Sequence, residues 1–166
     1  MATLTADEID DTCIEIVDYI QKNHSQYYSR VKFMYLYGCR IGELFDNRIL
    51  LDLANSKVNI IAQKNNNIRQ DFIIDLEVPA LIENIQLTEG NFWINKRNLQ
   101  RIIIQAKPYR NLYCGSKSIG AHLFRHNWVK KQIQSGKQIG TIDAMLGYTS
   151  QTIADTYLPS IIKSKQ

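Results

Sequence analysis

The segment His122-Leu-Phe-Arg125-His126 carries three side chains that can donate hydrogen bonds to an anion. On a helix, positions i, i+3 and i+4 lie on one face, so the two imidazoles and the guanidinium point the same way. A zinc-protease motif requires Glu directly after the first His, but Leu123 stands there. The planar guanidinium and the imidazole N–H groups suit a phosphate better than a metal. The same pattern also fits an ordinary helix with one packed and one solvated side, so both interpretations stay open.

Four more side chains can act on such a ligand. Arg40 opens a short predicted helix, where a cation is disfavoured by the helix dipole. An anion bound between Arg40 and the first N–H groups explains this placement, and so does a salt bridge to Glu43. Lys64 lies at a predicted hairpin tip, either reaching toward a ligand or simply solvated. Tyr148 and Tyr157 indicate no role when taken in isolation.

Taken together, the motifs resemble the catalytic domain of the tyrosine recombinase (phage integrase) family over nearly the whole chain. The box Gly38-Cys-Arg40-Ile-Gly-Glu43-Leu44 is similar to GxRxxEL, and the second box is similar to HxLRH with Phe124 in place of Leu. Tyr148 lies 23 positions after Arg125, and Tyr157 nine positions after that, as in the family's LGH(x)8-TY ending. The other matching residues are Lys64 and Arg69 of a GKGxKxR-like hairpin, Gly136, Leu146 and Gly147.

The residue types fit phosphodiester chemistry. Arg40 and Arg125 can clamp the non-bridging oxygens, which gain charge in the transition state, and His122 can add a donor or move a proton. Tyr157 is the expected nucleophile, giving a phosphotyrosine that preserves the bond energy for religation. The resemblance implies that Lys64 protonates the leaving 5′ oxygen. We expect no cofactor and no metal ion, because cationic side chains occupy the role of magnesium.

Two departures from the family pattern leave alternatives open. Tyr148 stands where the family has His or Trp, and Gln63 and Asn65 replace the glycines around Lys64. A tyrosine hydroxyl still donates one hydrogen bond, so we expect Tyr148 to support catalysis. The first interpretation is a site-specific recombinase or integrase of a virus or mobile element. The alternatives are a recombinase-fold protein that binds DNA without turnover, and relaxation of DNA like that by a type IB topoisomerase.

Charge points in the same direction, though weakly. Residues 1–18 hold six acids and no Lys or Arg, so the remaining chain holds 20 bases against 10 acids. A basic body of this kind fits a nucleic-acid partner, and on charge alone a surplus of solvated lysines explains it equally well. The resemblance implies double-stranded DNA as the partner, with self-assembly into a dimer or tetramer on it. The residues expected to contact DNA are Lys96, Arg97, Arg101, Arg69 and His126.

Composition excludes several other classes. The length of 166 residues fits one domain, and 45% hydrophobic with 22% charged residues is typical of a globular chain. No apolar run is long enough to span a membrane, and the start of the chain does not resemble a signal peptide. Three separated cysteines favour a reducing compartment, hence a cytoplasmic protein acting on nucleoid or host-cell DNA.

The apolar periodicity predicts a mainly α-helical α+β domain over residues 1–166. The resemblance implies that the family's amino-terminal DNA-clamping domain is absent, because Arg40 comes only 40 residues from Met1. A small antiparallel sheet follows the third helix, with Lys64-Asn-Asn-Asn67 as its hairpin turn. Residues 108–117 are expected to form a loop. The predicted helices cover residues 5–22, 25–37, 40–46, 79–85, 96–107, 118–135 and 150–155, with approximate ends. One more helix is expected between the last two of these, and it ends near residue 147. The predicted strands cover residues 49–53, 57–63 and 68–74.

Overall fold

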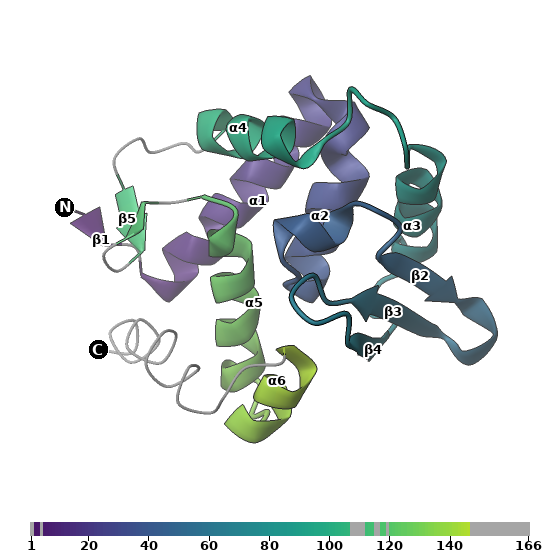
Figure 1. The fold of residues 1–166 in the computed structure, drawn as a ribbon. Helices are drawn as coiled ribbons and strands as arrows, with labels where there is room; N and C mark the ends of the chain where they lie inside the picture. The colour runs from purple at the N-terminus through teal and green to yellow at the C-terminus, as the bar shows by residue number, and fades with distance from the viewer. Residues whose placement is uncertain (1, 4, 107–111, 115–116, 119, 147–166) are drawn as a thin grey trace.

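The computed structural model describes residues 2–3, 5–106, 112–114, 117–118 and 120–146. It confirms a mainly α-helical α+β fold (Figure 1). The helices are α1 (Ala6–Asn23), α2 (Tyr28–Tyr37), α3 (Val78–Leu87), α4 (Lys96–Ala106), α5 (His122–Gln134) and α6 (Ile139–Leu146), with 3-10 turns η1 (Ser25–Tyr27), η2 (Ile41–Leu44) and η3 (Leu53–Asn55). No helix in these residues is both long and apolar enough to cross a membrane.

Two small sheets lie at opposite ends of the molecule (Figure 1). The predicted antiparallel sheet is present, in the order β2 (Ile49–Asp52), β3 (Lys57–Ile61) and β4 (Ile68–Phe72). The second sheet was not predicted, and it corrects the expectation of a loop over residues 108–117. It comprises β1 (Ala2–Thr3), β5 (Leu112–Cys114) and β6 (Lys117–Ser118), with β1 parallel to β5. Strands of two or three residues are too short to show an alternating pattern.

Several local interactions fix the ends of helices and the hairpin turn. The Thr5 hydroxyl accepts a hydrogen bond from the Glu8 N–H at 3.3 Å, and the Glu8 carboxylate accepts one from the Thr5 N–H at 3.2 Å. Asn95 caps α4 by accepting the Asn98 N–H at 2.8 Å. Asn66 has a φ of 59° in the hairpin turn, the left-handed conformation that asparagine tolerates.

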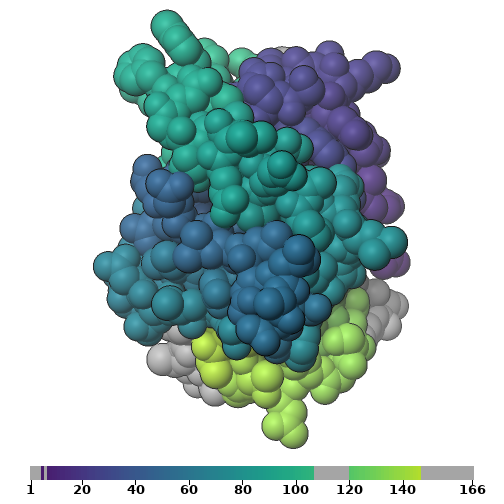
Figure 2. Space-filling view, turned by 90° about the vertical axis from the view of Figure 1, so that its right-hand side faces the viewer, coloured from purple at the N-terminus to yellow at the C-terminus, as the bar shows by residue number. Residues whose placement is uncertain are grey.

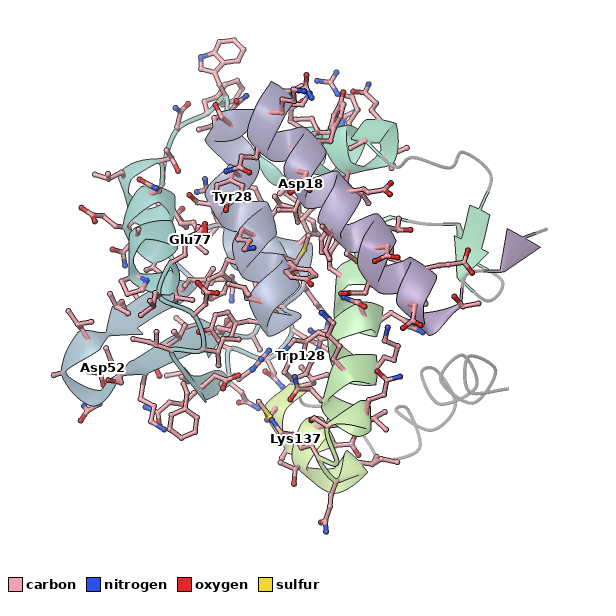
Figure 3. The ribbon with its side chains drawn as sticks, turned by 180° about the vertical axis from the view of Figure 1, so that it is seen from behind. Asp18, Tyr28, Asp52, Glu77, Trp128 and Lys137 are labelled. Atoms are coloured by element: carbon pink, nitrogen blue, oxygen red, sulfur yellow. The ribbon has the colours of Figure 1, made fainter. Side chains whose placement is uncertain are left out.

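Gly38 ends α2 and brings the chain against α5. Its φ is 65°, and its N–H donates to the Met34 carbonyl at 2.8 Å. A Cβ at this position would lie 2.4 Å from the Trp128 ring, which projects from α5 toward the end of α2 (Figure 3). Glycine is therefore required both by the backbone conformation and by the packing.

The core joins α1, α2 and α5, and it fixes how α5 lies. Phe124 is fully buried and Trp128 is 4% exposed, so both belong to the core. A polar network also crosses the three helices. The Asp10 carboxylate accepts hydrogen bonds from Lys131 at 2.6 Å, Asn127 at 2.9 Å and Tyr35 at 3.0 Å. Because the network is charge-assisted and partly buried, it favours one orientation of α5 relative to α1 and α2.

Some boundaries differ from the sequence-based ones. The short helix expected over residues 40–46 is the 3-10 turn η2, and the helix expected from Ser118 begins at His122. The last predicted helix, over residues 150–155, lies outside the described residues.

Candidate active site

A cavity of about 320 Å³ lies where η2, the entry to the β3–β4 hairpin, α4 and α5 meet. It brings together Arg40, His122 and Arg125, which come from both predicted catalytic boxes. None of the described residues that line it is acidic. The lining residues are Cys39, Arg40, Ile41, Gly42, Gln63, Lys96, Gln100, Ile104, Ala121, His122 and Arg125. A lining with several cationic side chains and no acidic one attracts an anionic ligand.

Glu43 connects the first arginine to the hairpin. Its buried carboxylate accepts the backbone N–H of Arg40 at 2.8 Å and that of Gln63 at 3.1 Å. The sequence suggested an anion or a salt bridge for Arg40, but did not reveal this backbone role of Glu43. The carboxylate thereby fixes the main chain on both sides of the cavity.

Gly42 leaves room for the side chain of Gln63. A Cβ added there would lie 2.0 Å from the Gln63 amide oxygen. Lys64 follows Gln63 immediately and is exposed in the hairpin turn. Gln63 thus lines the cavity, while Lys64 lies beside it at the surface.

Arg125 is 3% exposed and bridges the ends of two helices, α2 and α6. Its Nη1 donates to the Gly38 carbonyl at 3.1 Å, and its Nη2 to the Leu146 carbonyl at 3.5 Å. The first bond ties α5 to the end of α2, and the second ties it to the last described residue of α6. A guanidinium has five N–H donors, so it can hold carbonyls and also face a ligand.

His122 is the first residue of α5 and is exposed, while Arg40 is half-buried just before η2. Cys39, between Gly38 and Arg40, also lines the cavity. Burial, and secondarily the charge of Glu43, raise the pKa of the Cys39 thiol to about 12. The thiol is therefore protonated near neutral pH and is a poor nucleophile.

Arg69 does not face solvent as a DNA contact requires. It is 9% exposed, its Nη2 bonds the Asp71 carboxylate at 3.0 Å and the Tyr37 carbonyl at 2.7 Å, and it lies 4.6 Å from the centre of the Trp128 ring. These contacts make it a packing residue between β4 and α5. The structure thus gives Arg69 partners within the protein, and its contact with DNA stays a prediction from the sequence.

His126 is half-buried on α5. Burial and the neighbouring Lys130 lower the pKa of His126 to about 4. Its imidazole is therefore neutral near pH 7, which removes the charge that a phosphate contact would use. The remaining DNA candidates, Lys96, Arg97 and Arg101, are exposed on α4, and Lys96 also lines the cavity.

Two sequence-predicted residues, Tyr148 and Tyr157, lie outside the described residues. Gln100 and Ile104 of α4 are among the cavity residues that were not predicted as site residues. Their spacing is a signal in retrospect, because Lys96, Gln100 and Ile104 repeat every four positions along one face.

Comparisons with known proteins identify the fold. Among solved structures, XerA recombinase matches with a TM-score of 0.67 and 18% identity, over 99% of this chain and 64% of that one. A lambda integrase dimer bound to a COC′ core site matches with a TM-score of 0.65 and 13% identity, over 94% of this chain and 58% of that one. XerH recombinase bound to its difH substrate, in a pre-cleavage complex, matches with a TM-score of 0.60 and 18% identity, over 95% of this chain and 50% of that one.

These similarities show that the chain has the fold of a tyrosine recombinase catalytic domain. The chain spans between one half and two thirds of the length of these relatives. No model of a protein family matches the sequence, and neither does any curated protein.

Proposed function

We propose that this chain is the catalytic domain of a site-specific DNA recombinase or integrase. One observation carries the proposal: Arg40 lines the same cavity as His122 and Arg125, which lie more than 80 positions further along the chain, and none of the described lining residues is acidic. A cleft with two guanidiniums and an imidazole is suited to a phosphodiester in its transition state. The fold shared with recombinases bound to DNA supports the same substrate.

In the proposed reaction, the Tyr157 oxygen attacks phosphorus and forms a 3′-phosphotyrosine, while the bond to the 5′ oxygen breaks. Lys64 gives a proton to that leaving oxygen, and His122 takes the phenolic proton. Arg40 and Arg125 stabilise the charge on the non-bridging oxygens. Attack by a 5′ hydroxyl on the phosphotyrosine reverses these steps and rejoins a strand. No residue in this scheme calls for a metal ion.

Tyr148 is proposed to donate one hydrogen bond to the same phosphate, in place of the His or Trp of the family. Lys96, Arg97 and Arg101 are proposed to hold the DNA backbone next to the cavity, because all three are exposed on α4. Assembly of copies on double-stranded DNA is part of the proposal.

A nicked duplex can trap the covalent intermediate, because the short fragment that carries the 5′ hydroxyl dissociates after cleavage and religation is then prevented. Incubated with EDTA, the unaltered chain is expected to form an adduct at the 3′ phosphate, and Tyr157→Phe is expected to form none while still binding DNA. Tyr19→Phe, on the surface of α1, is the matched control and should form the adduct normally. Adduct from Tyr157→Phe would overturn the choice of nucleophile. Binding without any adduct from the unaltered chain would favour the alternative of a DNA-binding protein without turnover.

A further inference from the structure

Two aromatic side chains are exposed side by side just before α4. Phe92 is 81% and Trp93 79% exposed, and their ring centres lie 5.6 Å apart at an angle of 81°. Exposing two large rings to water is unfavourable. An exposed aromatic pair therefore indicates a binding surface.

The main chain that carries the pair is fixed to the core. Tyr27, fully buried, donates its hydroxyl to the Trp93 carbonyl at 3.1 Å and accepts the Asn95 N–H at 3.2 Å. The Trp93 N–H also donates to the Asn91 side chain at 3.0 Å. The rings are thus presented on an ordered backbone, which lowers the entropy cost of binding a ligand.

The chain that follows the pair is basic. No Asp or Glu occurs between Gly90 and Ile142, whereas ten Lys or Arg do. Lys96 and Arg97 follow the pair directly and are exposed, and Lys96 also lines the cavity. Figure 2 shows α4, in green, at the upper edge of the surface. Lys96 therefore connects the cavity with the pair, since it lines the cavity and follows Trp93 by three positions.

We propose that Phe92 and Trp93 form a stacking site for an unpaired DNA base, with Lys96 and Arg97 holding the adjoining phosphates. Aromatic rings next to basic side chains are typical of surfaces that bind single-stranded nucleic acid. In a paired duplex the faces of the bases are covered by their neighbours, so the rings select unpaired ones. The site rests on the proposed function, because exchanging strands unpairs the bases near a break.

Fluorescence can test the site directly, because the chain has only two tryptophans and Trp128 is buried. The full chain is titrated with a duplex that has a short single-stranded gap and with the fully paired duplex of the same sequence. We expect quenching of Trp93 by the gapped duplex and about tenfold tighter binding of it. Trp93→Ala should abolish this preference, and Trp93→Phe should retain part of it. Leu87→Ala removes an exposed apolar side chain at the end of α3 and should retain all of it.

Equal preference for gapped DNA in Trp93→Ala and the unaltered chain would overturn the proposal. So would sedimentation that shows self-association lost in Trp93→Ala without any change in DNA preference, since the pair would then bind a second copy. The adduct assay is independent. A preference for gaps without an adduct would refute the proposed catalysis only, and an adduct without the preference would refute the stacking site only.

Discussion

Two buried arginines bind consecutive carbonyls at the end of α2, yet they belong to different environments. Arg69 donates to the carbonyl of Tyr37 at 2.7 Å, and Arg125 to that of Gly38 at 3.1 Å. Arg69 is paired with Asp71 and covered by Trp128, whereas Arg125 lines the cavity. Burial and charge therefore do not identify a functional arginine. What distinguishes the two is whether the guanidinium faces a counter-ion of the protein or a cavity.

The largest difference is expected in catalysis. Arg125→Lys keeps the charge but loses the planar fork, so DNA cleavage should fall by about 10²- to 10³-fold. Arg69→Lys should stay within about fivefold of the unaltered chain, because Arg69 does not line the cavity. Single-turnover formation of the adduct, at a temperature where both variants are folded, measures this. Equal losses in the two variants would abolish the distinction.

Stability should reveal the structural role of Arg69. Arg69→Met leaves the Asp71 carboxylate without its ion pair and should lower the free energy of unfolding by about 3 kcal/mol. Adding Asp71→Asn removes the unpaired charge and should restore part of that loss. Urea denaturation of the two variants gives the values. A double variant as unstable as the single one would show that the ion pair is not the cause.

Lys64 extends the comparison to an exposed residue beside the cavity. As a general acid it should contribute about 10²-fold to cleavage, so Lys64→Ala should be slow on ordinary DNA. A 5′-bridging phosphorothioate has a good leaving group and should rescue this variant. It should not rescue Arg125→Ala, whose defect lies in charge stabilisation. Rescue of both, measured as adduct formation, would contradict these separate roles.

The sequence predicted the cavity better than it predicted Arg69. The boxes around Arg40 and Arg125 depend on local features, such as the glycine that ends α2 and the helical spacing in α5. In β4 the pattern misleads, because Ile68 and Phe72 are 67% and 62% exposed while Arg69 is buried. The register explains this, since Arg69 lies opposite Ile60 on the inner face. On this face of β4 an ion pair stands where apolar residues are usual. The alternation of apolar and polar residues alone therefore assigns the inner face of β4 to the exposed side.

The second sheet was unpredictable for another reason. β1 and β5 are parallel strands from the two halves of the chain, and no local turn signals their pairing. The close approach of Gly42 and Gln63 is similar, since it depends on how η2 meets the hairpin. Contacts between distant segments, held by a buried carboxylate such as Glu43, leave no periodic trace in a sequence.

The smallest effect concerns His126, next to Arg125 in the chain but half-buried. Its pKa in the folded protein is about 4, whereas the ordinary value is 6.5, so the unfolded chain binds a proton first as the pH falls. The stabilisation from keeping this imidazole neutral is complete above about pH 6.5 and decreases as the pH falls toward 4. Between pH 7.5 and 5 the free energy of unfolding should decrease by on the order of 1–2 kcal/mol. His126→Gln does not titrate, so its urea midpoint should change less over the same range. An equal pH dependence in both proteins would mean that folding does not lower the pKa of His126, and the difference from Arg125 in environment would then not extend to it.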